Sequence, residues 1–131
     1  MISPARSWRP VAVALVVGCG MLLGASIGGD ARAAEVPYVP TPPNVVDAML
    51  NLAKVGPSDF VIDLGSGDGR IVIAAARRFG ARGLGVEIDG ALVSDSIREA
   101  QRQGVADKVA FHSGNLFVTD IDKASVVTMY L

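Results

Sequence analysis

Side chains that hold metal ions or form disulfides are scarce in this sequence, which has one cysteine and one histidine among 131 residues. Cys19 lies in an apolar N-terminal stretch, so the rest of the chain has neither a disulfide nor a thiolate metal site. Nothing near His112 completes a metal site or a nucleophile and base pair. The pattern G-x-S-x-G is also missing, so Ser66 is no nucleophile elbow. We therefore expect no bound metal.

An excess of positive charge is absent as well. Three of the 12 basic residues and one of the 13 acidic residues lie in the first 33 positions, which leaves nine basic and twelve acidic residues in positions 34–131. That part of the chain carries a net charge of −3, and nothing in it indicates a nucleic-acid partner.

The one long hydrophobic run is at the N-terminus. Arg6 and Arg9 precede an uncharged stretch over residues 11–29, and the small residues at 31–33 have the spacing that a signal peptidase reads. This run has three interpretations: a cleaved export signal, an uncleaved membrane anchor or a lipoprotein box ending at Cys19. We expect residues 1–33 to be a signal peptide or a membrane anchor. The protein would then be exported, to the periplasm or beyond the cell, or associated with the membrane through this segment.

Beyond this run the chain alternates between strand and helix patterns. Four prolines in residues 34–43 keep the path extended, and Thr41 is the expected N-cap of a first helix, with Pro42 at its first position and its end near Ala53. Strands are expected at 60–64, 84–88, 109–112 and 124–130, and helices at 71–79 and 91–103. This order predicts an α/β fold with a Rossmann-like, doubly wound parallel sheet over residues 34–131.

A glycine turn follows the first of these strands. Gly65, Gly67 and Gly69 let a ligand lie against the backbone, at a helix end that carries partial positive charge. The dinucleotide fingerprint needs a small residue at position 70, which Arg70 occupies. The turn therefore disfavours a pyrophosphate and, with it, a nicotinamide-dependent oxidoreductase.

Two acids flank the turn. Asp63 precedes it at the carboxyl end of the strand, where a carboxylate attracts an ammonium group and repels a phosphate, or ties down the turn through backbone N–H groups. Glu87 lies 18 residues beyond Gly69, the distance at which an acid accepts both ribose hydroxyls, unless it is a strand-end acid in water. S-adenosylmethionine has such an ammonium, a ribose and no phosphate.

Two further residues are candidates for cofactor contacts. Asn115, in a turn after the third strand, is placed to accept from the amine of an adenine, or it is a simple turn asparagine. Tyr38 lies among the prolines, where it either covers a ligand or packs on the surface.

Three segments, 61–69, 85–89 and 113–117, resemble in order and spacing the cofactor motifs of class I S-adenosylmethionine-dependent methyltransferases. Segments 36–42 and 124–131 are similar to a narrower group, which includes bacterial methyltransferase-domain proteins and the lysine methyltransferases of the mitochondrial ATP synthase c-subunit. The resemblance implies that Asp63 and the turn, including Ser66, hold the methionine part, Glu87 the ribose and Asn115 the adenine, where the family commonly has Asp. It further implies a protein lysine as one possible acceptor.

Family members have a seven-stranded sheet, whereas the patterns here account for four strands. We expect a fragment that ends after the fourth strand, in which residues 126–130 form an exposed sheet edge open to another chain. No catalytic base is visible, and Tyr130 is the one weak candidate for the acceptor pocket. A truncated cofactor-binding or interaction module without catalysis is the remaining alternative.

Overall fold

Within residues 37–131 the long helices and the strands occur where the apolar pattern predicts them, within two residues at each boundary, whereas the strand at Ala12–Val16 was not predicted. The computed structural model describes residues 12–16 and 37–131. Its elements in chain order are β1 (Ala12–Val16), α1 (Pro43–Leu52), β2 (Phe60–Leu64), α2 (Arg70–Phe79), β3 (Arg82–Glu87), α3 (Gly90–Arg102), β4 (Val109–Ser113), the short 3₁₀ helix η1 (Leu116–Val118) and β5 (Val126–Tyr130).

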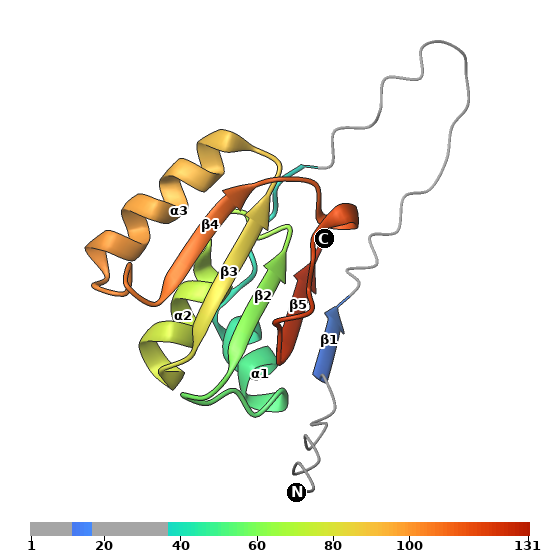
Figure 1. Ribbon diagram of the computed structural model, residues 1–131, viewed down its shortest axis with the longest axis vertical. Coiled ribbons are helices and arrows are strands. Elements are labelled where there is room, and N and C mark those ends of the chain that lie inside the picture. The colour runs from blue at the N-terminus through green and yellow to red at the C-terminus, as the bar shows by residue number, and fades with distance from the viewer. Residues whose placement is uncertain (1–11, 17–36) are drawn as a thin grey trace, which may run out of the picture.

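The sheet is parallel and has the strand order β1-β5-β2-β3-β4 (Figure 1). The chain builds outward from β2 to β3 and β4 and then returns to the other side of β2 with β5. This reversal is the mark of a doubly wound sheet, so the predicted Rossmann-like α/β class is confirmed. The reversal also creates a switch point between β2 and β5, where ligands of such sheets bind.

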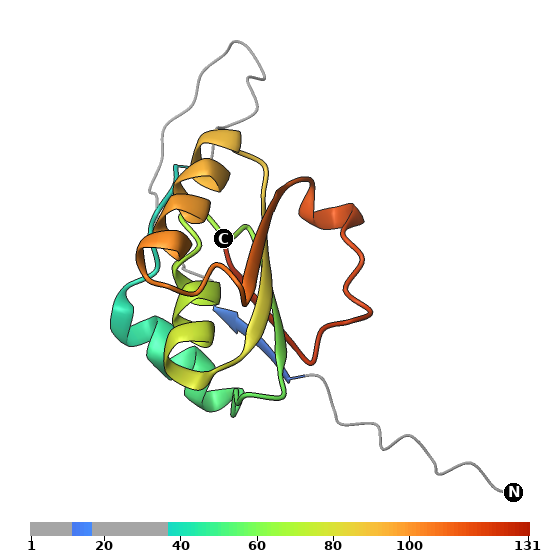
Figure 2. The same cartoon turned by 60° about the vertical axis from the view of Figure 1, so that its left-hand side comes forward.

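Neighbouring residues of β2 face opposite sides of the sheet, which separates the core into layers. Val61 packs with Leu50 of α1 and Ile71 of α2, whereas Ile62 packs with Val127 on the other face. Figure 2 shows α1, α2 and α3 on one side of the sheet and the β4–β5 connection, which includes η1, on the other. Apolar residues on both faces explain why β2 has an almost continuous hydrophobic sequence.

The first helix begins one residue later than predicted. Pro42 is the N-cap of α1 and Pro43 its first residue, and no side chain caps the helix. The prediction that Thr41 is the N-cap is therefore wrong. Two consecutive prolines explain the difference, because a residue before a proline avoids helical dihedrals and Pro42 itself precedes Pro43. Thr41 is instead buried, and its carbonyl accepts a hydrogen bond from Arg70 Nη1 at 2.8 Å.

The expected open edge of the last strand is covered within the same chain. β1 pairs with β5 in parallel from Ala12 opposite Val126 to Val16 opposite Tyr130 (Figure 1). The prediction of an exposed edge is therefore wrong, because it treated residues 1–33 as separate from the sheet. Within residues 12–16 and 37–131 no helix has the length and apolarity to cross a membrane. Cys19 and the cleavage pattern at 31–33 lie outside the described residues, so the signal or anchor role of 1–33 stays a prediction.

Removing residues 1–33 should make the protein self-associate. The deletion removes β1 and leaves the backbone N–H and C=O groups on one side of β5 without partners, and such an edge recruits a strand from another copy. Light scattering should show a monomer for the full chain and larger species for residues 34–131. A chain that starts at residue 12 retains β1 and is the matched control. A monomeric 34–131 with a cooperative thermal transition would contradict this expectation.

Candidate cofactor site

The predicted site residues converge at the carboxyl ends of β2, β3 and β5. Asp63 is the fourth residue of β2, Glu87 is the last of β3, and Tyr130 is the last of β5. These ends meet at one edge of the parallel sheet, beside the switch point. The glycine turn continues from β2 at the same edge and leads into α2 (Figure 1).

The turn has the backbone that its glycines predict. Gly65, Gly67 and Gly69 have φ values of 76°, 53° and 78°, a region that residues with a Cβ rarely adopt. At Gly67 the space is restricted as well, because a Cβ would lie 2.4 Å from the ring of Tyr38. Tyr38 therefore packs directly on the turn, although 47% of its surface stays exposed. This position is compatible with both predicted roles, covering a ligand and packing on the domain.

Glu87 connects the end of β3 to the turn. One carboxylate oxygen, Oε2, accepts from Gly67 N at 2.8 Å, and the other accepts from Ile88 N and Asp89 N at 2.8 and 3.0 Å. Three backbone donors fix its orientation, and each oxygen of a carboxylate accepts more than one hydrogen bond. Glu87 is therefore not a strand-end acid held only by water: it lies against the turn with acceptor capacity left for a ligand.

Asp63 lies deeper than the sequence suggested. Only 1% of its surface is exposed, and its Oδ1 accepts a hydrogen bond from the Thr128 hydroxyl at 2.7 Å. Burial raises the pKa of Asp63 to about 7, the Thr128 hydrogen bond acts in the opposite direction, and the charges of Glu87 and Asp68 raise it further. The carboxylate makes no hydrogen bond to a turn amide of the described chain, in contrast to the tying role considered above.

Two buried serines belong to the turn or contact it: Ser66 in the turn itself and Ser96 in α3. Ser96 of α3 is fully buried, and its hydroxyl lies 3.1 Å from the carbonyl oxygen of Gly67 and 2.9 Å from that of Leu92, both acceptors. Ser66 is also buried, but its hydroxyl has no hydrogen-bond partner among residues 12–16 and 37–131. A buried hydroxyl without a partner is unfavourable unless a ligand or water satisfies it.

Arg70 links the segment before α1 to the turn, a role that the sequence did not predict. Arg70 donates from Nε to Asp68 Oδ1 at 2.9 Å and from Nη1 to the carbonyl of Thr41 at 2.8 Å. Asp68 N in turn donates to the Tyr38 hydroxyl at 3.4 Å. Burial opposes ionisation of Asp68, but the hydrogen bonds and charge of Arg70 outweigh it and lower the pKa of Asp68. Arg70 thus holds the Tyr38 segment across the glycine turn.

Asn115 and Tyr130 lie at the same edge with fewer contacts. Asn115 is exposed and caps η1, because its Oδ1 accepts from Phe117 N at 2.9 Å. That is the turn role considered above, and the oxygen retains a second lone pair for an adenine amine. Tyr130 is partly buried, and its hydroxyl makes no hydrogen bond within the described residues. The next residue, Leu131, packs against Gly65, since a Cβ there would lie 2.6 Å from its Cδ2.

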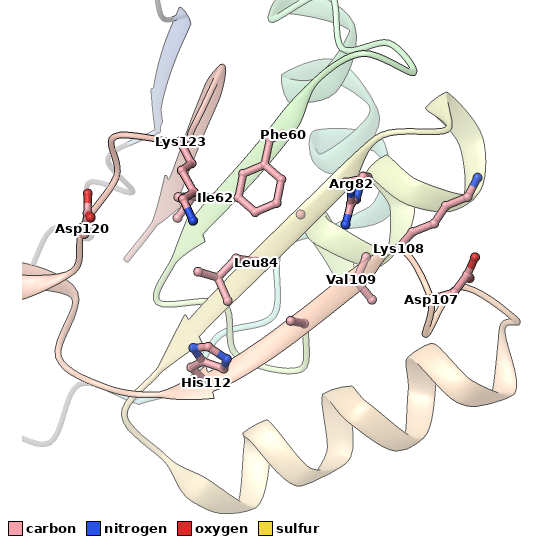
Figure 3. A pocket seen from close by; sticks show the side chains of 12 residues that line it. Phe60, Ile62, Arg82, Leu84, Asp107, Lys108, Val109, His112, Asp120 and Lys123 are labelled. Atoms are coloured by element: carbon pink, nitrogen blue, oxygen red, sulfur yellow. The ribbon is translucent and has the colours of Figure 1, made fainter.

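A separate hollow of about 380 Å³ opens on the sheet face opposite the helices. Figure 3 shows Phe60, Ile62, Leu84 and His112 on β2, β3 and β4, with Lys123 reaching in from the segment before β5. None of the predicted cofactor residues lines it. The site at the strand ends and this hollow are therefore distinct places in the structure.

The parallel doubly wound sheet, the glycine turn and the two acids define the class: an S-adenosylmethionine-dependent methyltransferase fold. The profile of the ANTKMT methyltransferase domain matches residues 63–131, more than half of the sequence. The chain belongs to this methyltransferase family, which confirms the predicted resemblance.

Known relatives agree on the class. A protein-lysine N-methyltransferase of Saccharolobus islandicus is 46% identical over 98 residues, which are 74% of this chain and 61% of the relative. A lysine N-methyltransferase of Caenorhabditis elegans, named for the c-ring protein of ATP synthase, is 35% identical over 101 residues, which are 72% of this chain and 53% of the relative. The chain thus spans little more than half the length of these curated relatives.

A solved structure is also similar. It is an RNA methyltransferase from Salinibacter ruber in complex with S-adenosyl-L-homocysteine, with 59% identity and a TM-score of 0.70 over 71% of this chain and 61% of that one. Its bound ligand agrees with the cofactor predicted from the turn. Both kinds of comparison favour the methyltransferase interpretation over the oxidoreductase.

Proposed function

We propose that this chain carries the cofactor site of an S-adenosylmethionine-dependent methyltransferase whose acceptor is a lysine of a protein. One observation carries the proposal. At the end of β3 the Glu87 carboxylate is held by a hydrogen bond from Gly67 N, and the buried Asp63 carboxylate lies near it. Glu87 has an acceptor site for a ribose hydroxyl and Asp63 one for an ammonium. Arg70, the cation that follows the turn at the start of α2, is paired with Asp68 and so is not free for a pyrophosphate.

The residues present fit this cofactor. The turn glycines bring no side chain of their own to the turn, which Tyr38 and Leu131 border. The buried Ser66 hydroxyl has no partner in the described part of the chain. We assign the ribose to Glu87, the methionine part to Asp63 and the turn, and the adenine to Asn115. Tyr38 covers the turn from the side of α1. These assignments use acceptors that the hydrogen bonds described above leave available.

The bound cofactor would supply an electrophilic methyl group on a sulfonium. The protein's contribution to such a transfer is to position the acceptor in line and to exclude water. Tyr38, packed on Gly67, and Leu131, packed on Gly65, border the turn with apolar surface. Tyr130, the last residue of β5, directly precedes Leu131 and is the proposed pocket residue for an amine acceptor.

The protein acceptor is favoured over RNA for two reasons. Two of the curated relatives described above are lysine methyltransferases, and residues 34–131 carry a net charge of −3, which opposes binding of a polyanion. RNA is the second candidate, because the Salinibacter ruber protein that is 59% identical is named an RNA methyltransferase.

Methyl transfer from radiolabelled S-adenosylmethionine to a cell extract tests the proposal. We expect label in the protein fraction, at lysines located by mass spectrometry, and loss of that label when the extract's lysines are chemically blocked beforehand. Label that is sensitive to ribonuclease and indifferent to lysine blocking would establish the RNA alternative. Binding of S-adenosylhomocysteine without transfer to either fraction would favour a non-catalytic module, and binding of NAD alone would contradict the cofactor.

A further inference from the structure

Thr128 lies next to Asp63 in the middle of the sheet. The two residues are directly opposite each other in the pairing of β2 with β5, and the Thr128 hydroxyl donates to Asp63 Oδ1 at 2.7 Å. The residues are 0% and 1% exposed, so water does not compete with this bond. Asp63 Oδ2 accepts no hydrogen bond from the described residues.

The surroundings of Asp63 otherwise oppose its ionisation. Glu87 at the end of β3 and Asp68 in the turn bring negative charge toward it, and burial removes its hydration. Arg70 at the start of α2 is paired with Asp68 and, among the described residues, forms no ion pair with Asp63. From β5 the facing group is the neutral Thr128 hydroxyl, which is the one described side chain that hydrogen-bonds the carboxylate.

We propose that Thr128 is a positioning residue for cofactor binding, whose hydroxyl favours the ionised form of the Asp63 carboxylate and turns it so that Oδ2 receives the ammonium of the cofactor's methionine part. This inference rests on the proposed function and adds a residue to it. Oδ1 is used inside the protein and Oδ2 is left for the ligand. Thr128 on the neighbouring strand β5 thus sets the ionisation and the orientation in which Asp63 meets the cofactor.

The arrangement links cofactor affinity to pH. An ammonium stabilises the ionised form of Asp63, so the pKa of Asp63 in the complex lies below its value of about 7 in the free protein. Binding below that pH must release a proton, and affinity then falls by about tenfold for each pH unit. Above it the carboxylate is already ionised and affinity levels off. Removing the Thr128 hydroxyl should move the levelling point upward by about one pH unit or more.

Calorimetric titration of the full chain with S-adenosylhomocysteine, from about pH 5.5 to about pH 8.5, tests the proposal. This probe carries the same ammonium. In the wild type we expect the affinity to rise with pH and to level off at about pH 7. In Thr128→Val it should level off at a higher pH. Thr128→Ser keeps the hydroxyl and should have the wild-type profile. Asp63→Asn should bind weakly with no such rise, which tests the linkage without altering Thr128. Methylthioadenosine lacks the amino-acid part, so its affinity should be the same for wild type and Thr128→Val.

The outcomes are distinct. An unchanged pH profile in Thr128→Val, or a Thr128→Ser variant as shifted as the valine one, would overturn the role of Thr128 and leave the cofactor assignment intact. Equal losses for S-adenosylhomocysteine and methylthioadenosine would show a general structural effect and would also overturn it. A wild type that binds neither compound would overturn the proposed function together with this inference.

Discussion

Replacing Gly69 with alanine should lower the free energy of unfolding by about 2–5 kcal/mol, the sum of left-handed backbone strain and overpacking. Gly69 has φ of 78°, and a Cβ there would lie 2.6 Å from Phe111 Cε1 and 2.9 Å from Ser96 Cβ. Phe111 is in β4 and Ser96 in α3, so neither neighbour is free to move aside. Denaturant titration of the purified variant measures the change.

Two other glycines provide matched controls for Gly69. Gly104 has φ of 71° with nothing within 4 Å of its added Cβ, so Gly104→Ala should cost only the backbone strain of about 1–2 kcal/mol. Gly90, at the start of α3, is in open space and has no positive φ, so Gly90→Ala should be neutral or slightly stabilising. Equal losses for Gly69→Ala and Gly104→Ala would show that contact with Phe111 and Ser96 does not limit the turn.

Replacing Glu87 with alanine should reduce the affinity for S-adenosylhomocysteine by about tenfold to a hundredfold. Three backbone N–H groups already donate to this carboxylate, two to Oε1 and one to Oε2, so its free acceptor site is on Oε2. We propose that this site accepts one ribose hydroxyl, and such a bond to a charged group contributes about 1.5–3 kcal/mol, or about tenfold to a hundredfold in affinity. The variant also leaves Gly67 N without its present acceptor, which loosens the turn. Calorimetry measures the loss.

Glu87→Gln separates the two contributions of this side chain. The amide keeps one oxygen acceptor and nearly the same shape, so binding should be weakened less than in the alanine variant. Asp107→Asn is the control for charge, because Asp107 is exposed and precedes β4 at the opposite edge of the sheet. Wild-type affinity in Glu87→Ala would remove Glu87 from the ribose site.

The sequence was sufficient to predict features that depend on residues close together along the chain. Three glycines at alternate positions specify a turn of positive φ, and an apolar strand before it with an amphipathic helix after it fixes the place of the turn. The acids Asp63 and Glu87 could be located because parallel strands end at one edge. These features are properties of a short stretch of chain and require no knowledge of which strands are neighbours.

The tertiary structure alone decided which distant residues meet. Thr128 is 65 residues from Asp63, and their contact depends on β5 lying beside β2. The pairing of β1 with β5 and the bond from Arg70 to the carbonyl of Thr41 likewise join segments that no local pattern connects. Strand order is set by how the whole apolar surface is buried and how backbone groups find partners, so it is a property of the complete fold. The turn and its two acids are therefore encoded locally, whereas the burial and orientation of Asp63 arise only when the sheet is assembled.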